Sequence, residues 1–209
     1  MKTFMTMLPS RATVAARLLR PLRLGSALNW TVVLTCVMGA AASLVAAPDT
    51  RGLLGAALAV LMIHIANNDA RRFIIPNEAV AAALALALVQ AAVDAPGRVL
   101  EAMAIAGLRA AVMGALFFLL REAYWRIRGR EGLGLGDVKL AGVAGAWLEW
   151  TLVPAAIEIA ALAALALYLL RCRRTGRHLR ATSRIPFGLF LAPSIWICWL
   201  LEVVMLAPR

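Results

Sequence analysis

Acidic residues are scarce in this sequence, and their scarcity limits the functions that the chain can have. The 209 residues contain 11 Asp and Glu against 22 Lys and Arg, and the first carboxylate along the chain is Asp49. On a soluble protein a net charge of +11 would suggest a nucleic-acid partner. Only two tyrosines occur, however, and aromatic residues do not alternate with basic ones. We therefore interpret the positive charge as a signal of membrane topology and exclude a nucleic-acid partner.

Cysteine and histidine are rare as well. Cys36 and Cys198 lie in apolar runs, where a thiol behaves as a small hydrophobic group. Cys172 lies among arginines in an expected cytoplasmic loop, where disulfides are uncommon. The histidines, His64 and His178, do not join Cys or carboxylates at the spacing of metal ligands. The sequence therefore predicts no metal site, and we expect no cofactor.

Apolar residues are abundant. They make up 63% of the chain, and the mean hydropathy is +0.82, which is too apolar for a soluble domain of this size. Seven apolar runs approach the length of about 20 residues that a helix needs to cross a bilayer. We predict an all-α, polytopic membrane bundle of about seven transmembrane helices. The expected helices cover residues 27–47, 53–68, 77–95, 101–120, 137–149, 152–170 and 187–206.

The distribution of positive charge predicts the orientation of these helices. Lys and Arg concentrate in residues 1–26 and in the loops after the second, fourth and sixth helices, whereas the other connections and the C-terminus hold Arg51, Arg98 and Arg209. Because positive residues favour the cytoplasmic side, we expect a cytoplasmic N-terminus. Residues 1–26 form a basic lead-in segment, and residues 27–209 form the membrane domain. Val45-Ala46-Ala47 resembles a signal-peptidase site, but the apolar run is longer than a signal core, which favours a retained helix.

Two acidic motifs stand at the ends of apolar runs, on the same predicted side of the membrane. Asp137 follows three glycines at alternate positions and precedes the run that ends at Leu148. Asp69 ends another run and is followed, after six residues, by Pro76-Asn77. An ionisable group at such a place is a candidate functional residue. The alternative is that Asp137 is only a helix N-cap. Asn77 is itself an expected N-cap.

These motifs resemble those of the type IV prepilin peptidases, which are GxGD-type intramembrane aspartic proteases. The resemblance covers roughly residues 53–195. Its matching residues are Asp69, Pro76 and Asn77 in the first motif, Gly134, Gly136 and Asp137 in the second, and Ile185, Pro186, Phe187 and Gly188 in a third. The resemblance implies an aspartic endopeptidase of the bacterial inner membrane that cleaves the leader peptide of prepilins or pseudopilins at the cytoplasmic face. Asp69 and Asp137 would be its catalytic residues.

Two carboxylates in contact cannot both ionise cheaply, so they share a proton and can serve as base and acid together. Gly134 and Gly136 either leave room for an extended substrate or permit close packing. Lys139 lies two residues after Asp137 and should point away from it, toward lipid phosphate. His64 is expected to line the site without acting as a base.

Members of the resembled family that also methylate the new N-terminus carry a loop with paired C-x-x-C zinc motifs before the first catalytic Asp. This sequence has no such motif, so we expect a peptidase without methyl transfer. Leu189 stands where longer members often have Pro, which affects the assignment to a subfamily. A transporter that uses Arg109 and Glu158, a tentative ion pair, is an alternative, and so is an inactive scaffold. The sequence leaves the oligomeric state open.

Overall fold

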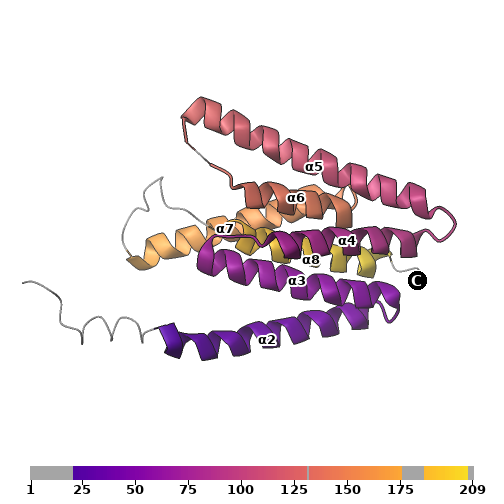
Figure 1. The fold of residues 1–209 in the computed structure, drawn as a ribbon. Helices are drawn as coiled ribbons and strands as arrows, with labels where there is room; N and C mark the ends of the chain where they lie inside the picture. Colours follow the sequence, from indigo (N-terminus) through magenta and orange to yellow (C-terminus); the bar gives the residue numbers. More distant parts are fainter. Residues whose placement is uncertain (1–20, 131, 176–185, 207–209) are drawn as a thin grey trace, which may run out of the picture.

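The described part of the chain is entirely helical (Figure 1). A computed structural model describes residues 21–130, 132–175 and 186–206, with side chains for 30–130, 132–173 and 186–205. No strand occurs within these ranges. Their helices are α2 (Pro21–Ala46), α3 (Thr50–Arg72), α4 (Asn77–Asp94), α5 (Val99–Arg128), α6 (Leu135–Trp147), α7 (Leu152–Thr175) and α8 (Gly188–Leu206). The predicted all-α fold is confirmed. Most of the basic N-terminal segment and of the basic loop after α7 lies outside the described residues.

Five of the described helices, α3, α4, α5, α7 and α8, are long and apolar enough to cross a membrane. The apolar part of α2, Trp30–Ala46, is shorter. Helix α6 has 13 residues and therefore a length of about 20 Å, against a hydrocarbon core of about 30 Å. The structure is thus a membrane helical bundle, as expected, but α6 is too short to cross the hydrocarbon core by itself.

Helix α6 is the central element, and its small residues explain how its neighbours approach it. Every residue from Leu140 to Trp147 is buried, and the helix packs against α4, α5 and α8. A Cβ added to Gly145 would lie 2.5 Å from the carbonyl oxygen of Arg109 on α5. The indole Nε1 of Trp147 donates a 2.8 Å hydrogen bond to the carbonyl oxygen of Ala83 on α4. Close backbone contact thus holds α6 to α5, and a buried hydrogen bond holds it to α4.

Tryptophans of α8 connect the other helices. The ring of Trp199 meets Trp147 edge to face, with centroids 6.4 Å apart, and fills the space that a Cβ on Gly55 of α3 would occupy. The indole of Trp196 donates to the hydroxyl of Ser43 on α2. Helix α2, which the sequence predicts to be retained, therefore packs directly against the bundle through α3 and α8.

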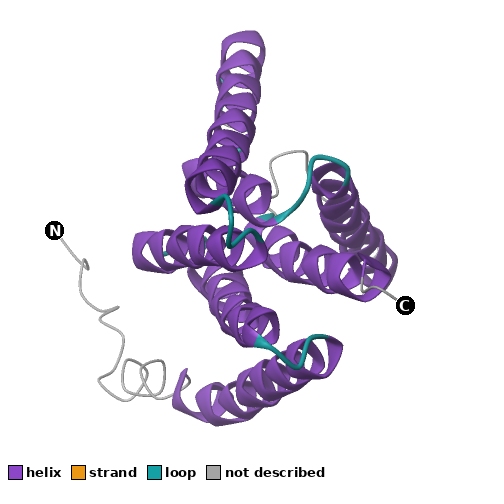
Figure 2. Ribbon diagram, turned by 90° about the vertical axis from the view of Figure 1, so that its right-hand side faces the viewer, coloured by secondary structure: helices purple, strands orange, loops and turns teal. Residues whose placement is uncertain are grey.

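Helices α3 to α8 run back and forth (Figure 1), so the C-terminal ends of α3 and α5 lie beside the N-terminal ends of α4, α6 and α8. We call this the aspartate end, because Asp69 is in the last turn of α3 and Asp137 is in the first turn of α6. Figure 2 views the bundle from the opposite end, where short loops join the closely packed helices.

Helices α3, α5 and α7 extend further than the sequence predicts, and α7 continues to Thr175. Helix α3 continues to Arg72, and α5 continues to Arg128, so residues expected in loops lie on helices. A hydrogen-bonded ion pair between Arg126 and Glu122, one turn earlier, supports the extension of α5. Helices α3 and α5 each stop at a residue in the left-handed conformation, Phe73 (φ 55°) and Gly129 (φ 64°) respectively. The chain ends its helices where a cap is available, not where the apolar run ends.

Candidate active site

Asp69 is held at the last turn of α3 with its side chain turned into the protein. The turn is closed by Phe73, whose N–H donates a 2.9 Å hydrogen bond to the backbone carbonyl of Asp69. Only 6% of the residue is exposed, although it belongs to the polar end of its helix. Burial of a carboxylate requires hydrogen-bond donors.

The donors come from the start of α8. The N–H of Leu189 donates a 2.9 Å hydrogen bond to Oδ2 of Asp69, and the N–H of Gly188 also donates to this carboxylate. The first N–H groups of a helix lack partners within the helix and carry partial positive charge, so they suit an anion. The Pro186-Phe187-Gly188 motif therefore positions Asp69. Pro186 and Gly188 are buried and Phe187 is partly buried, whereas Ile185 lies outside the described residues.

Asp137 lies at the third helical position of α6. The N-cap is Gly134, whose N–H donates a 3.2 Å hydrogen bond to Oδ2 of Asp137. Asp137 is therefore not the N-cap itself, which corrects the simplest alternative interpretation of the motif. Its carboxylate still takes part in capping, because it accepts the hydrogen bond from the N–H of the N-cap residue. One oxygen of Asp137 thus accepts a hydrogen bond from a backbone N–H at the start of α6, and one oxygen of Asp69 does the same at the start of α8.

Ile75 brings the two acidic motifs together, a role that the sequence analysis missed. A Cβ added to Gly136 would lie 3.0 Å from Cδ1 of Ile75, and one added to Gly188 would lie 2.8 Å from the same atom. The Cβ on Gly188 would also lie 2.9 Å from Oδ2 of Asp69. The carboxylates of Asp69 and Asp137 are near enough to interact electrostatically. All three motifs thus meet around one isoleucine side chain.

The glycines of the second motif are explained by packing in this structure. Gly136 faces Ile75, and a Cβ on Gly132 would overlap the ring of Tyr124 on α5. A Cβ on Gly134 would lie 3.3 Å from Oδ2 of Asp137. These contacts favour close packing over an open substrate channel at Gly136. They also show why the loop between α5 and α6 needs glycine at alternate positions.

Lys139 and Asn77 form a second link between the motifs. The Nζ of Lys139 donates a 2.7 Å hydrogen bond to Oδ1 of Asn77, across 62 residues. As predicted, Lys139 does not pair with Asp137, and its hydrogen-bond partner within the protein is Asn77. Asn77 is not the N-cap of α4 either, because Pro76 occupies that position and Asn77 is the first helical residue. The sequence held a signal that Pro76, and not Asn77, precedes the helix, because proline cannot continue a helix that comes before it.

Other polar residues near the site have partners of their own. His64 is exposed and forms a 2.9 Å hydrogen bond with Asn68, so it is directed to its own helix and not to Asp69. Among the described residues, no three His, Cys, Asp or Glu side chains gather as a metal site would require. The site that the described residues form consists of two carboxylates and backbone donors.

Comparison with known proteins shows the family of this chain. Residues 56–169, more than half of the chain, match the type IV leader peptidase family. The chain belongs to this family. The matched region contains both acidic motifs and ends before the third motif, so the contact between α8 and Asp69 is information that the structure adds. Membership makes the chain a homologue of the leader peptidases.

Curated relatives are named prepilin leader peptidase/N-methyltransferase. That of Burkholderia pseudomallei is 45% identical over 92 residues, covering 42% of this chain and 29% of the relative. That of Pseudomonas aeruginosa is 35% identical over 100 residues, covering 46% of this chain and 34% of the relative. That of Aeromonas hydrophila is 35% identical over 99 residues, covering 43% of this chain and 32% of the relative. The chain spans about a third of the length of the curated relatives that it matches. No solved structure matches it.

The tentative pair of Arg109 and Glu158 is wrong. Glu158 lies on an exposed part of α7, whereas Arg109 lines a cavity between α4, α5, α6 and α8 together with Glu202. Arg109 and Glu202 interact electrostatically there. Helix α5 packs against α6, which also contacts α8, and the side chain of Arg109 therefore faces the cavity that Glu202 of α8 lines. The cavity lies at the opposite end of the bundle from the two aspartates.

Proposed function

We propose that this protein is an aspartic endopeptidase that removes the leader peptide from type IV prepilins or pseudopilins, with Asp69 and Asp137 as its catalytic pair. The observation that carries the proposal is the convergence of three distant segments. The end of α3, the start of α6 and the start of α8 bring two carboxylates and their backbone donors to one place. Membership of the leader peptidase family supports the substrate class.

The pair would act while it holds one proton. The ionised carboxylate accepts a proton from a water molecule, and the water oxygen attacks the scissile carbonyl carbon. The protonated carboxyl donates its proton to the carbonyl oxygen, giving a neutral gem-diol. When this collapses, the carbon–nitrogen bond breaks, a proton passes to the leaving amine, and one proton remains shared by the pair. The backbone donors at Gly134 and Leu189 keep the two carboxyl groups oriented.

The aspartate end would face the cytoplasm of a bacterial inner-membrane protein. Arg71, Arg72, Arg126 and Arg128 lie in the last turns of α3 and α5 at this end, whereas Arg51 and Arg98 lie at the other. Positive residues favour the cytoplasmic side and anionic lipid. Residues 1–26 would then be a cytoplasmic lead-in to the membrane domain. This orientation puts the pair where the basic leader of a prepilin precedes its apolar helix.

We further propose that the chain does not transfer a methyl group. The segment before Asp69 contains Cys36 alone, and no C-x-x-C pair occurs in the 209 residues. Mass spectrometry of the cleaved pilin should therefore find a free N-terminal amine. A terminus heavier by one methyl group would contradict this part of the proposal.

Co-expression with a prepilin tests the peptidase. The wild type should convert the precursor to the shorter form on a gel, whereas Asp69→Asn and Asp137→Asn, inserted at wild-type levels, should not. Asp49→Asn is the matched control, because Asn also caps helices and the residue is at the opposite end of α3. Cleavage that persists in either site variant would refute the pair. An uncut precursor with the wild type would favour a scaffold or a transporter.

A further inference from the structure

A polar cavity of about 290 Å³ lies at the end of the bundle opposite the aspartates. Helices α4, α5, α6 and α8 supply its walls. Its polar and charged lining residues are Gln90, Asp94, Arg98, Glu101, Arg109, Glu149 and Glu202. The volume is near the lower limit for small-molecule sites and far above the space for one water molecule. None of these residues belongs to the proposed catalytic pair or to its motifs.

Three buried atoms in this lining lack a hydrogen-bond partner among the described residues. They are Oε1 of Gln90, Nε of Arg109 and Oε2 of Glu202. Two are acceptors and one is a donor. Buried polar groups are almost always paired, so three unpaired atoms in one cavity point to a missing partner.

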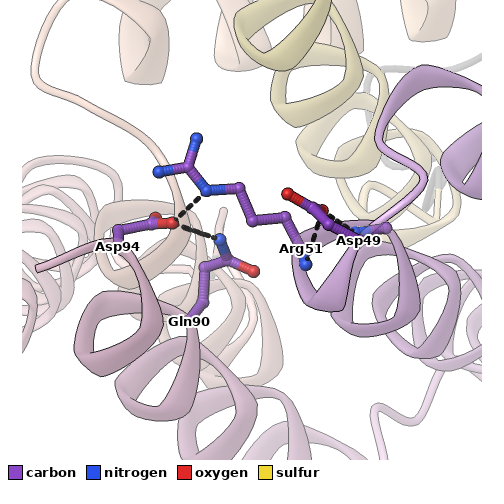
Figure 3. Close-up of polar contacts among 5 residues, drawn as sticks. Asp49, Arg51, Gln90 and Asp94 are labelled. Carbon is purple, nitrogen blue, oxygen red and sulfur yellow. Dashed lines mark hydrogen bonds and ion pairs between the residues drawn. The ribbon is translucent and has the colours of Figure 1, made fainter. Parts of the chain in front are cut away.

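The orientation of Gln90 is determined by its neighbours. Its Nε2 donates to both carboxylate oxygens of Asp94 at 3.0 Å, and Asp94 also pairs with Arg51 from α3 (Figure 3). An ionised carboxylate only accepts hydrogen bonds, so the amide nitrogen must face Asp94 and the amide oxygen must face away. Gln90 is 7% exposed, so this oxygen is buried with no donor. The contact with Arg51 holds the arrangement in place.

The charges define the complementary ligand. Four carboxyl groups line the cavity, those of Asp94, Glu101, Glu149 and Glu202, and three guanidinium groups accompany them: Arg98 and Arg109 in the lining and Arg51 on Asp94. With all four carboxyl groups ionised, negative charge is in excess by one. The Glu202 carboxylate accepts a hydrogen bond from the backbone of Glu149, which leaves its Oε2 for another donor. A primary ammonium has three N–H donors and suits Gln90 and Glu202. An oxyanion on the same molecule suits Arg109.

We propose that this cavity binds a small zwitterion that carries a primary ammonium and an oxyanion, such as an ethanolamine phosphate group. The group can come from a phosphatidylethanolamine head group or from a free solute of the same chemistry. A quaternary ammonium does not fit, because it has no N–H to offer to the two acceptors. An anion without an ammonium leaves both acceptors unpaired and adds negative charge.

The test is binding to the purified, full-length protein in detergent, followed by native mass spectrometry and by thermal unfolding. The probes are phosphatidylethanolamine, phosphatidylcholine, phosphatidylglycerol and soluble glycerophosphoethanolamine. We expect saturable binding of phosphatidylethanolamine or glycerophosphoethanolamine, and at least tenfold weaker binding of the other two lipids. Binding of the lipid alone identifies a membrane source, and equal binding of the soluble compound identifies a free solute. Either result supports the site.

Variants connect the binding to the cavity. Glu202→Gln keeps the shape of the side chain and should weaken binding about tenfold or more, because it removes a charged acceptor. Gln90→Leu should also weaken binding. Glu158→Gln, the same chemical change on the exposed part of α7, should leave binding unchanged. Equal binding of all three lipids, no binding of either ethanolamine compound, or unaltered binding in both cavity variants would overturn the proposal.

Discussion

The backbone N–H of Leu189 donates a 2.9 Å hydrogen bond to Oδ2 of Asp69, which lies 120 residues earlier in the chain. This contact places the start of α8 against the end of α3 and provides a buried carboxylate with a donor. It also makes the position before it, Gly188, sensitive to added atoms. The first prediction follows from that sensitivity.

Gly188→Ala should lower leader cleavage without preventing membrane insertion. The added Cβ would lie 2.9 Å from Oδ2 of Asp69 and 2.8 Å from Ile75, so the carboxylate or α8 has to move. Displacement of a catalytic group by about 1 Å costs up to about 100-fold in rate. The rate of prepilin cleavage at matched protein levels measures the effect. Gly107→Ala on α5, where a Cβ meets nothing within 4 Å, should retain full activity.

Gly136→Ala should also reduce cleavage, and Ile75→Ala should restore part of it. The Cβ at position 136 would lie 3.0 Å from Cδ1 and 3.1 Å from both Cγ1 and Cβ of Ile75, so Ile75→Ala removes two of the three close atoms and relieves the contact in part. Contacting residues of this kind typically couple by about 0.5–3 kcal/mol. The cleavage rates of the two single variants and the double variant form the cycle. Strictly additive losses would show that Gly136 is required for a reason other than Ile75.

Trp147→Phe should destabilise the protein, whereas Trp150→Phe should not. The indole of Trp147 is buried and donates to the carbonyl oxygen of Ala83, so Phe removes this buried hydrogen bond and part of the side-chain volume packed around it. This costs about 1–3 kcal/mol. Trp150 is 49% exposed and provides the matched control. Thermal unfolding in one detergent should show a lower midpoint for Trp147→Phe alone, and equal midpoints for the two variants would contradict the packing of α6 on α4.

Lys139→Met and Asn77→Ala should have small, non-additive effects on stability. The two side chains share a hydrogen bond of 2.7 Å but are exposed. Even an exposed salt bridge contributes only about 0–1 kcal/mol, and this bond has one neutral partner. Once one partner is removed, removal of the other should cost little more. Unfolding midpoints of the single and double variants test this. A double variant with the full sum of both losses would show that the residues act separately.

Local patterns in the sequence were sufficient to predict the architecture. The lengths of the apolar runs predict the helices, because the bilayer requires a given length of apolar chain whatever the partners are. The alternation of those runs also predicts that Asp69 and Asp137 lie at one end, which the structure bears out, since Gly136 and Gly188 both meet Ile75 there and Gly188 also meets Asp69. Helix ends were less predictable. Helices α3 and α5 continue past the apolar runs until Phe73 and Gly129 cap them.

The partners of the key side chains could not be predicted in this way. Three examples are the N–H of Leu189 on Asp69, the contact of Ile75 with Gly136, and the position of Glu202 beside Arg109. Each joins residues far apart in the chain, and each depends on which helix faces pack against one another. Apolar faces rich in alanine and glycine specify burial but not a particular neighbour. The residue types and their order were therefore enough to predict a membrane bundle with two acidic motifs, and three-dimensional packing alone determined what those acids touch.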